Sequence, residues 1–535
     1  MEEIIYLNGN NLTIANVIKI AEKGYKVDFP EHIKQNIIKI REGLEKQLSE
    51  HPEIKIYGTN VGCGDLKDET ITPESFESYQ VKYIKAHNCG TGNPLPIEIV
   101  RGIMVIRLNS FAKGLSAIRM STCQLMIDML NNDVTPWVLE EGSVGASGDL
   151  IPLAMIGASL IGLPESKAYY KGELLSSQEA LKRANLKPIK LGAKEAMGLT
   201  NGSNFISSIA AFAIRDAEIL LNTASVTSAL SLEAIRGEKD AFSNLINDNR
   251  PHKGQLYIAN QIRNLIKGSM RTTKEAQIFE YPGQIKDSIK VRVQDRYSFR
   301  AIPQVHGPVY EAIEKLKETL TIEINSATDN PLFFVDEKGF FHAKSGANFH
   351  GQPLANVIDY LKLSITTLGL VTDKRTFSLL DKYLNFGLPA DLAHDHSKGD
   401  TGLMLTQYAG AARAAESRVL STPASVMSVS TSANQEDFVS MGSIGVIHLR
   451  KVIYNTQIIL GVELLCALRA LQMSYDILPE ELRQLGQGTD IVYNALNKEL
   501  PPVDEDQYMR LDMEKAIELI KSGKVLDLVK DIINE

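Results

Sequence analysis

The chain has 535 residues, of which 44% are hydrophobic and 23% are charged, and its formal net charge is −8. This balance is ordinary for a globular protein of several hydrophobic cores, and the negative charge argues against nucleic acid or an anionic membrane as a partner. The first residues, MEEIIYLNGNNLT, include acidic residues and no long apolar run, so we expect no signal peptide. The cysteines (Cys63, Cys89, Cys123 and Cys466) have no CxxC or framework spacing. We therefore expect reduced thiols in a cytoplasmic protein.

Helical periodicity dominates the chain. Apolar residues recur at three- and four-residue spacing near 97–131, 204–236, 307–327, 352–371, 402–420, 446–475 and 511–533. Several of these segments exceed the usual helix length, which predicts long bundled helices. Candidate strands are few and short: residues 54–60, and a hairpin near 332–343 with its turn at Glu337-Lys338-Gly339. The expected fold class is mainly α.

Some of these helices are apolar nearly all round, as in GLMLTQYAGAARAA, and such a helix has to be buried on all sides. Helices from several subunits that form a shared core would meet this need, so we expect a homo-oligomer. The longest apolar stretch, 449–475, includes Arg450, Lys451, Glu463 and Arg469. These charges predict a buried or interface helix and no membrane span.

One segment, 141–154, crowds small residues before an apolar helix and reads EGSVGASGDLIPLA. Glycine allows backbone conformations closed to other residues and lets chain segments approach closely. In Ala146-Ser147-Gly148 this freedom would bring the Gly148 nitrogen onto the Ala146 carbonyl carbon. Ring closure with loss of water, including the Ser147 hydroxyl, would leave an exocyclic methylene, which is a strong electrophile. Unmodified side chains lack this reactivity, which proteins normally borrow from a cofactor.

The same segment has other interpretations. A plain Gly-rich turn before a helix has this composition, and a motif without context is weak. A nucleophile elbow, G-x-S-x-G, would need Gly where Asp149 stands, and a phosphate-binding loop would need G-K-[ST]. The segment by itself therefore leaves two interpretations, the plain turn and the cyclised triad.

The string GSVGASGDLIPLA resembles the signature of the histidine and aromatic amino acid ammonia-lyases, in which Ala-Ser-Gly becomes 4-methylidene-imidazol-5-one (MIO). Other blocks resemble the family's motifs in the family's order, and together they favour the cyclised triad over a turn. These blocks are Tyr57-Gly58-Thr59-Asn60-Val61-Gly62, Thr200-Asn201-Gly202, Gln294-Asp295-Arg296-Tyr297-Ser298-Phe299-Arg300, Glu323-Ile324-Asn325-Ser326-Ala327-Thr328-Asp329-Asn330-Pro331, Gly346-Ala347-Asn348-Phe349-His350-Gly351 and Thr431-Ser432-Ala433-Asn434-Gln435-Glu436-Asp437.

The resemblance implies the ammonia-lyase fold, in which long helices form a central bundle. We expect an N-terminal domain over 1–200, with the tyrosine loop and the MIO segment. The central bundle and C-terminal helices over 201–535 complete one continuous catalytic unit. The resemblance also implies a homotetramer with sites shared between subunits. The implied cofactor is MIO, with no metal and no nucleotide.

Each matched residue takes a role that the resemblance implies. Tyr57 would remove the β-proton of the substrate, although a free tyrosine has a pKa of about 10 and needs activation by the site. Asn201 would hydrogen-bond the prosthetic ring, and Tyr297 and Gln294 would orient the substrate. Arg300 would clamp the substrate carboxylate in a bidentate pair. Asn325 and Phe349 match positions that shape the pocket.

Three residues bear on the substrate ring. His87 is similar to the histidine in the Ser-His-x-x-Gly pattern of histidine lyases, and Met404 matches their pocket methionine. Glu436 matches the glutamate that accepts the imidazole. A buried carboxylate suits a ring that donates an N–H and costs free energy beside a ring that does not. The resemblance therefore favours elimination of ammonia from L-histidine, giving trans-urocanate.

The sequence also departs from the histidine-lyase pattern at several positions, and these departures leave alternative functions open. Cys63, Asp65 and Phe438 differ from the usual residues, and 388–396 lacks the Pro-Pro-Phe-Leu pattern. An ammonia-lyase acting on phenylalanine, tyrosine or a modified histidine, or an MIO-dependent 2,3-aminomutase, fits these departures. His394-Asp395-His396 and the pair His342/His350 suggest a metal enzyme, but without HExxH or Cys/His spacing. An inactive helical scaffold is the non-enzyme alternative.

Overall fold

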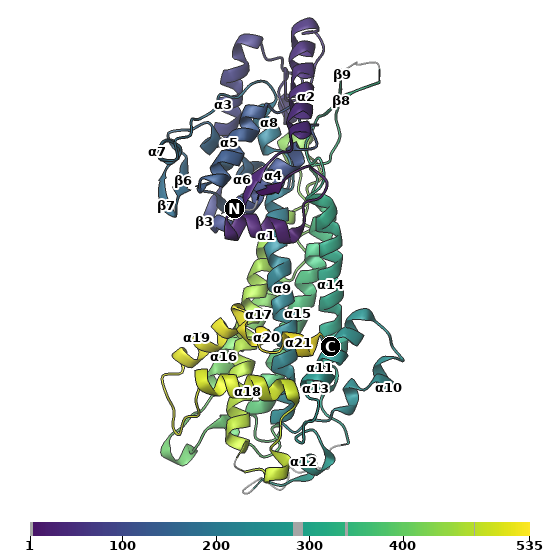
Figure 1. Ribbon diagram of the computed structural model, residues 1–535, viewed down its shortest axis with the longest axis vertical. Coiled ribbons are helices and arrows are strands. Elements are labelled where there is room, and N and C mark those ends of the chain that lie inside the picture. Colours follow the sequence, from purple (N-terminus) through teal and green to yellow (C-terminus); the bar gives the residue numbers. More distant parts are fainter. Residues whose placement is uncertain (1–3, 282–292, 338–340, 476, 535) are drawn as a thin grey trace. The chain divides into compact units, whose positions relative to one another are not determined.

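The structure is a computed structural model that describes residues 4–281, 293–337, 341–475 and 477–534 (Figure 1). It is mainly helical with a few short strands, which confirms the predicted fold class. The chain divides into two compact units. Unit 1 comprises 1–212, 315–359 and 423–447, and unit 2 comprises 213–314, 360–422 and 448–535. Unit 1 is thus discontinuous, whereas the sequence predicts a domain over 1–200, because segments far apart in the chain pack into one core.

The long helices are the most regular part of the fold, and each contributes residues to both units. They are α9 (Asn204–Ala234), α14 (Ile302–Glu323), α15 (Gln352–Leu380) and α17 (Gly442–Tyr475). In unit 2 a buried ion pair ties three of them together. Glu463 of α17 accepts from the Arg375 guanidinium of α15 at 2.5 and 3.0 Å and from the Ser231 hydroxyl of α9 at 2.8 Å. Such a bidentate pair compensates the desolvation of both charges.

Helices α15 and α17 are long and apolar enough to cross a membrane by length and composition. Their most apolar windows are 61% and 83% buried inside the protein, however. They are core helices. The charged residues from which we predict that 449–475 does not span a membrane belong to α17.

Unit 1 is built around two helices that are buried nearly all round, α4 (Ile97–Phe111) and α6 (Leu150–Leu160). Helix α1 (Ile14–Lys23) packs on α4, and α6 contacts α3 (Phe76–His87) and α8 (Glu195–Thr200). The buried Arg101 of α4 donates to the terminal carbonyls of α1, at Ile20 and Ala21, and so satisfies groups that a helix end leaves unpaired.

Two expectations for unit 1 are changed by the structure. The predicted strand at 54–60 is wrong: the Asn60 side chain accepts from the Ile56 N–H and donates to the Ile54 carbonyl, which closes a turn. The segment 97–131 forms two helices, α4 and α5 (Met120–Asn131), because Gly114 and Ala117 adopt positive φ between them. The hairpin near 332–343 forms as β8 (Leu332–Val335) and β9 (Phe341–Lys344), and its predicted turn extends outside the described residues.

The remaining helices have at most 20 residues, and the remaining strands are short. In unit 1 the others are β1 (Ile4–Tyr6), β2 (Lys26–Asp28), α2 (Glu31–Glu50), β3 (Thr91–Pro94), β4 (Val134–Pro136), β5 (Leu139–Glu141), β6 (Lys167–Tyr170), β7 (Glu173–Ser176) and α7 (Ser177–Arg183). In unit 2 they are α10 (Asn244–Asn247), α11 (Lys253–Leu265), α12 (Lys274–Ile278), α13 (Tyr297–Arg300), α16 (Met404–Leu420), α18 (Gln487–Glu499), α19 (Arg510–Lys521), α20 (Lys524–Asp527) and α21 (Lys530–Ile533). Gly523, at φ +75°, interrupts the predicted helix 511–533.

Candidate active site

A pocket of about 390 Å³ in unit 1 brings together residues from five separate segments of the chain. Tyr57 and His87 line it together with Ser147, Asn201 and Glu436. They come from the tyrosine loop, α3, the Gly-rich segment, the end of α8 and the 431–436 loop. The described pocket lining belongs entirely to unit 1.

The Ala146-Ser147-Gly148 segment is a tight turn, and the neighbouring main chain packs closely against it. Ser147 and Gly148 have φ of 49° and 83°, consecutive left-handed conformations that fold the chain back on itself. A Cβ on Gly148 would lie 2.3 Å from the Gly202 carbonyl oxygen. The Gly202 N–H donates to the Ser147 carbonyl at 3.2 Å, and Ala146 packs against a small apolar cluster. This close fold of the main chain fits ring closure between the Gly148 nitrogen and the Ala146 carbonyl carbon.

Asp149 anchors the turn from its C-terminal side. Its main-chain N–H donates to the Gly202 carbonyl at 2.8 Å. Its Oδ2 accepts from the N–H groups of Phe205 and Ile206 at 3.0 and 3.1 Å, in the first turn of α9, and Ser443 donates to its Oδ1 at 3.0 Å. The helix N-terminus favours the anion, but complete burial prevails and raises the pKa of Asp149 to about 7.

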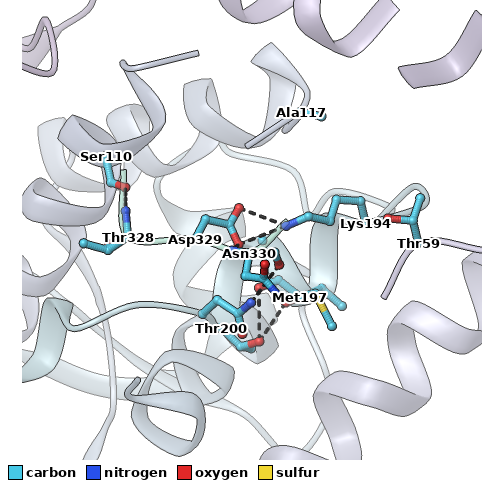
Figure 2. A network of polar contacts seen from close by, with 12 residues as sticks. Thr59, Ser110, Ala117, Lys194, Met197, Thr200, Thr328, Asp329 and Asn330 are labelled. Carbon is cyan, nitrogen blue, oxygen red and sulfur yellow. Dashed lines mark hydrogen bonds and ion pairs between the residues drawn. The ribbon is translucent and has the colours of Figure 1, made fainter. Parts of the chain in front are cut away.

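A second set of contacts holds Asn201 beside the turn. Asn201 donates from its side chain to the Asn330 carbonyl at 2.9 Å. The neighbouring Asp329 receives both hydrogen bonds from the buried Lys194 ammonium, and the Thr328 N–H donates to the Ser110 hydroxyl (Figure 2). These contacts hold the Thr328–Asn330 segment in place. They therefore also hold the Asn330 carbonyl to which Asn201 donates.

The Tyr57 hydroxyl accepts a hydrogen bond from the Gly64 N–H at 2.8 Å. Burial raises the pKa of Tyr57 above its usual value, and this hydrogen bond opposes the rise because it stabilises the phenolate. The nearby Glu436 carboxylate adds to the rise. In the described pocket Tyr57 is a weak acid that needs a further positive influence to act as a base near neutrality.

His87 is oriented by its own helix. Its Nδ1 lies 2.8 Å from the Tyr83 carbonyl oxygen, and its ring stacks on the Tyr83 ring with centroids 3.9 Å apart. A carbonyl oxygen only accepts, so Nδ1 carries the proton and Nε2 of the neutral ring is an acceptor. Tyr79, Tyr83 and His87 recur every four residues on α3, and this spacing was the signal in the sequence that could have placed both tyrosines in the pocket.

Glu436 is held by a strained loop. Ser432, Ala433 and Asn434 have φ of 51°, 48° and 69°, a run of left-handed residues that closes with the Thr431 N–H donating to the Glu436 carbonyl. The Thr431 hydroxyl donates to Glu436 Oε2 at 3.1 Å. The Ser147 hydroxyl donates to Glu436 Oε1 at 3.2 Å. The carboxylate therefore lies directly against the predicted cofactor precursor.

The other predicted site residues are not among the described residues that line this pocket. Gln294, Tyr297 and Arg300 belong to unit 2, where the Arg300 guanidinium lies over the Tyr297 ring at 4.5 Å and its Nε donates to the Asp295 carbonyl. Met404 begins α16, also in unit 2. Asn325 and Phe349 belong to unit 1, outside the described pocket lining. Asn325 pairs with both the N–H and the carbonyl of Leu12 at 2.9 Å.

The histidines considered as metal ligands have ordinary partners. His342 Nε2 lies 2.9 Å from Asp336 Oδ2, and both ring nitrogens of His396 lie near main-chain carbonyls. Within the described ranges, no group of three or more His, Cys, Asp or Glu side chains is arranged to hold a metal ion.

Residues 12–498 match the family described as aromatic amino acid lyase. Histidine ammonia-lyase of Caldanaerobacter subterraneus subsp. tengcongensis is 38% identical over 529 residues, which cover 98% of each chain. Histidine ammonia-lyase 2 of Fusobacterium nucleatum subsp. nucleatum is 40% identical, over 100% of this chain and 99% of that protein. The crystal structure of histidine ammonia-lyase from Trypanosoma cruzi superposes with a TM-score of 0.86 at 31% identity, over 99% of this chain and 95% of the other.

The chain belongs to the aromatic amino acid lyase family. Its fold is the ammonia-lyase fold, and as an enzyme it is an ammonia-lyase similar to histidine ammonia-lyases along its whole length. The family uses MIO. The predicted family, fold and enzyme class are confirmed.

Proposed function

We propose that this protein eliminates ammonia from L-histidine to give trans-urocanate, as a step of histidine breakdown. The observation that carries the proposal is the Glu436 carboxylate inside the pocket of Tyr57, His87 and Ser147. Glu436 is partly buried, and an imidazole N–H can donate to its carboxylate once the Ser147 hydroxyl is gone, whereas a phenyl ring cannot. The names of the full-length relatives agree with this substrate.

The cofactor of the proposed reaction is MIO formed from Ala146, Ser147 and Gly148, the turn whose main chain fits ring closure. When formed, MIO supplies an electrophilic methylene that takes up the substrate amine and makes the nitrogen a good leaving group. We assign the hydrogen bond to the ring to Asn201, whose side chain also donates to the Asn330 carbonyl.

Tyr57 removes the β-proton of the substrate in this proposal. Its hydroxyl oxygen already accepts from the Gly64 N–H, which leaves the O–H proton to be lost and stabilises the phenolate that results. The β-proton is weakly acidic, so positioning and preorganised donors supply most of the rate enhancement. Glu436 accepts the imidazole N–H, and His87, whose Nδ1 is engaged with the Tyr83 carbonyl, lines the same pocket.

The substrate carboxylate is assigned to Arg300, with Tyr297 and Gln294 orienting the substrate and Asn325, Phe349 and Met404 shaping the site. Arg300 is suited to a bidentate pair with a carboxylate. We further propose a homotetramer with sites shared between subunits. Unit 2 exposes large apolar side chains that such an assembly would cover: Leu363, Phe377, Leu405, Tyr408 and Val419. The free cysteines agree with a cytoplasmic enzyme.

The test is incubation of the purified protein with L-histidine, L-phenylalanine and L-tyrosine. Appearance of the ultraviolet absorbance of urocanate, with release of ammonia, is the expected result for histidine. Glu436→Gln should lower kcat/KM for histidine by about 10-fold or more, because a charge-assisted hydrogen bond is lost. Rates are divided by the fraction of chains that carry the mature cofactor. Preferred turnover of phenylalanine or tyrosine, or a β-amino acid as product, would replace the proposal by the corresponding lyase or aminomutase.

A further inference from the structure

The Ser147 hydroxyl has to leave for the electrophile to form, and the structure shows what lies against it. In the part of the chain that the structure describes, the side chain that hydrogen-bonds to Ser147 Oγ is Glu436, with Oε1 at 3.2 Å. The loop that carries Glu436 adopts a run of left-handed residues, and the Thr431 hydroxyl holds the other carboxylate oxygen at 3.1 Å. Strain of this kind persists where the surrounding structure needs a side chain in one place.

We propose that Glu436 is also the general acid that matures the enzyme, by protonating the departing Ser147 hydroxyl. This inference rests on the proposed function, because it presumes that the triad cyclises. Hydroxide is a poor leaving group, and a carboxyl group within hydrogen-bonding distance of the leaving oxygen supplies the proton that turns it into water.

Maturation releases two waters in two steps. The Gly148 N–H adds across the Ala146 carbonyl, and the hydroxyl so formed leaves with the proton of the Ser147 nitrogen, which gives the first water and the ring C=N bond. Next the Ser147 Cα–H gives its proton to solvent water. The released electron pair forms the Cα=Cβ bond as the Cβ–Oγ bond breaks, and Oγ leaves with the proton of the Glu436 carboxyl group. Glu436 starts as the carboxylate that accepts from Ser147, takes up the donated proton from solvent before this step and ends it as a carboxylate again, so the net change is loss of a second water.

Maturation then prepares Glu436 for its role toward the substrate. In the described structure the carboxylate accepts from two hydroxyl groups, Thr431 on Oε2 and Ser147 on Oε1. Loss of the Ser147 hydroxyl removes the donor to Oε1 and leaves that oxygen to accept a substrate N–H. One carboxyl group thus acts first on the protein's own serine and afterwards on the substrate.

The test follows maturation by mass and needs no turnover. The wild-type chain, Glu436→Gln and Glu436→Ala are synthesised in a cell-free system, quenched at intervals and weighed by intact-mass spectrometry. The fraction of chains that have lost the mass of two waters gives the maturation rate. Glu436→Gln keeps an oxygen that accepts from Ser147 but has no acidic proton, so its rate isolates the proton transfer. Asp437→Asn removes an exposed neighbouring carboxylate and is the matched control.

We expect both Glu436 variants to mature about 100-fold or more slowly than the wild type, and Asp437→Asn to mature at the wild-type rate. Circular dichroism and urea unfolding establish that each variant is folded, and Glu436→Gln decides the question should Glu436→Ala not fold. Maturation of folded Glu436→Gln at the wild-type rate overturns this inference and leaves the proposed function standing. A wild-type chain that never loses two waters overturns both.

Discussion

The Lys194 ammonium lies 2.9 Å from both carboxylate oxygens of Asp329, and neither side chain is exposed. Burial lowers the pKa of Lys194, and the Asp329 carboxylate opposes that shift. The pair joins the start of α8 to Asp329, the neighbour of Asn330 (Figure 2). The Asn330 carbonyl accepts a hydrogen bond from the Asn201 side chain. The position of a candidate catalytic amide therefore depends on an ion pair outside the pocket.

Removing one partner of this pair should destabilise the protein strongly. Lys194→Met and Asp329→Asn each leave an uncompensated or poorly paired buried group, so we expect each to lower the free energy of unfolding by about 3–5 kcal/mol. The double variant should lose clearly less than the sum, because no charge then stays unpaired. Urea unfolding at fixed protein concentration measures all three. Additive losses would show that the two side chains do not interact.

Asp149 should make stability depend on pH. Its pKa rises from 3.8 in the unfolded chain to about 7 in the fold, so the folded state binds the proton more tightly. Asp149 contributes on the order of a few kcal/mol to the free energy of unfolding through this proton. The contribution is fully present below about pH 4 and is lost as the pH rises through about 7. Asp149→Asn should therefore lose less stability than the wild type over this range. Equal pH dependence in urea unfolding would refute the assignment, with Asp437→Asn as the control.

Gly148→Ala should disrupt the turn that forms the cofactor. The new Cβ would meet the Gly202 carbonyl carbon at 2.5 Å and its oxygen at 2.3 Å, so we expect a loss of about 1–3 kcal/mol and no cyclisation. Gly172 has nearly the same φ, +85°, with open space around it, so Gly172→Ala carries the backbone strain without the clash. Intact mass and urea unfolding compare the two. Normal maturation of Gly148→Ala would contradict the close fit described for the turn.

Tyr57→Phe should lower kcat by about 10²–10⁴-fold while leaving maturation unchanged, because it removes a general base and no part of the triad. Since burial raises the pKa of Tyr57 above 10.0, the phenolate fraction grows with pH throughout the neutral range. Wild-type kcat should therefore rise toward alkaline pH, and the variant should lack that rise. Tyr79→Phe, in the same pocket, should retain most activity. Identical pH profiles for wild type and Tyr57→Phe would assign the base to another residue.

The sequence predicts the long helices well, because apolar spacing runs unbroken through α9, α15 and α17. It predicts less where a single side chain or backbone conformation decides the structure, as with Asn60 in the supposed strand and Ala117 between α4 and α5. These outcomes depend on local hydrogen bonds and positive φ values that periodicity does not encode.

For the site, the local motifs supply Tyr57, Ser147 and Glu436, which the structure brings to one pocket, and their roles stay predictions. The pairing of Lys194 with Asp329 joins residues 135 positions apart. No local pattern indicates that contact, because it arises only when the core of unit 1 assembles. The tautomer of His87 likewise depends on the Tyr83 carbonyl, which the fold of α3 supplies.

The most direct measurement is the intact mass of the purified protein beside that of Ser147→Ala. We predict that the wild-type chain weighs two water molecules less than its sequence, that Ser147→Ala does not show this full loss, and that only the wild type reacts with borohydride. A wild-type mass equal to that of the unmodified sequence would contradict it.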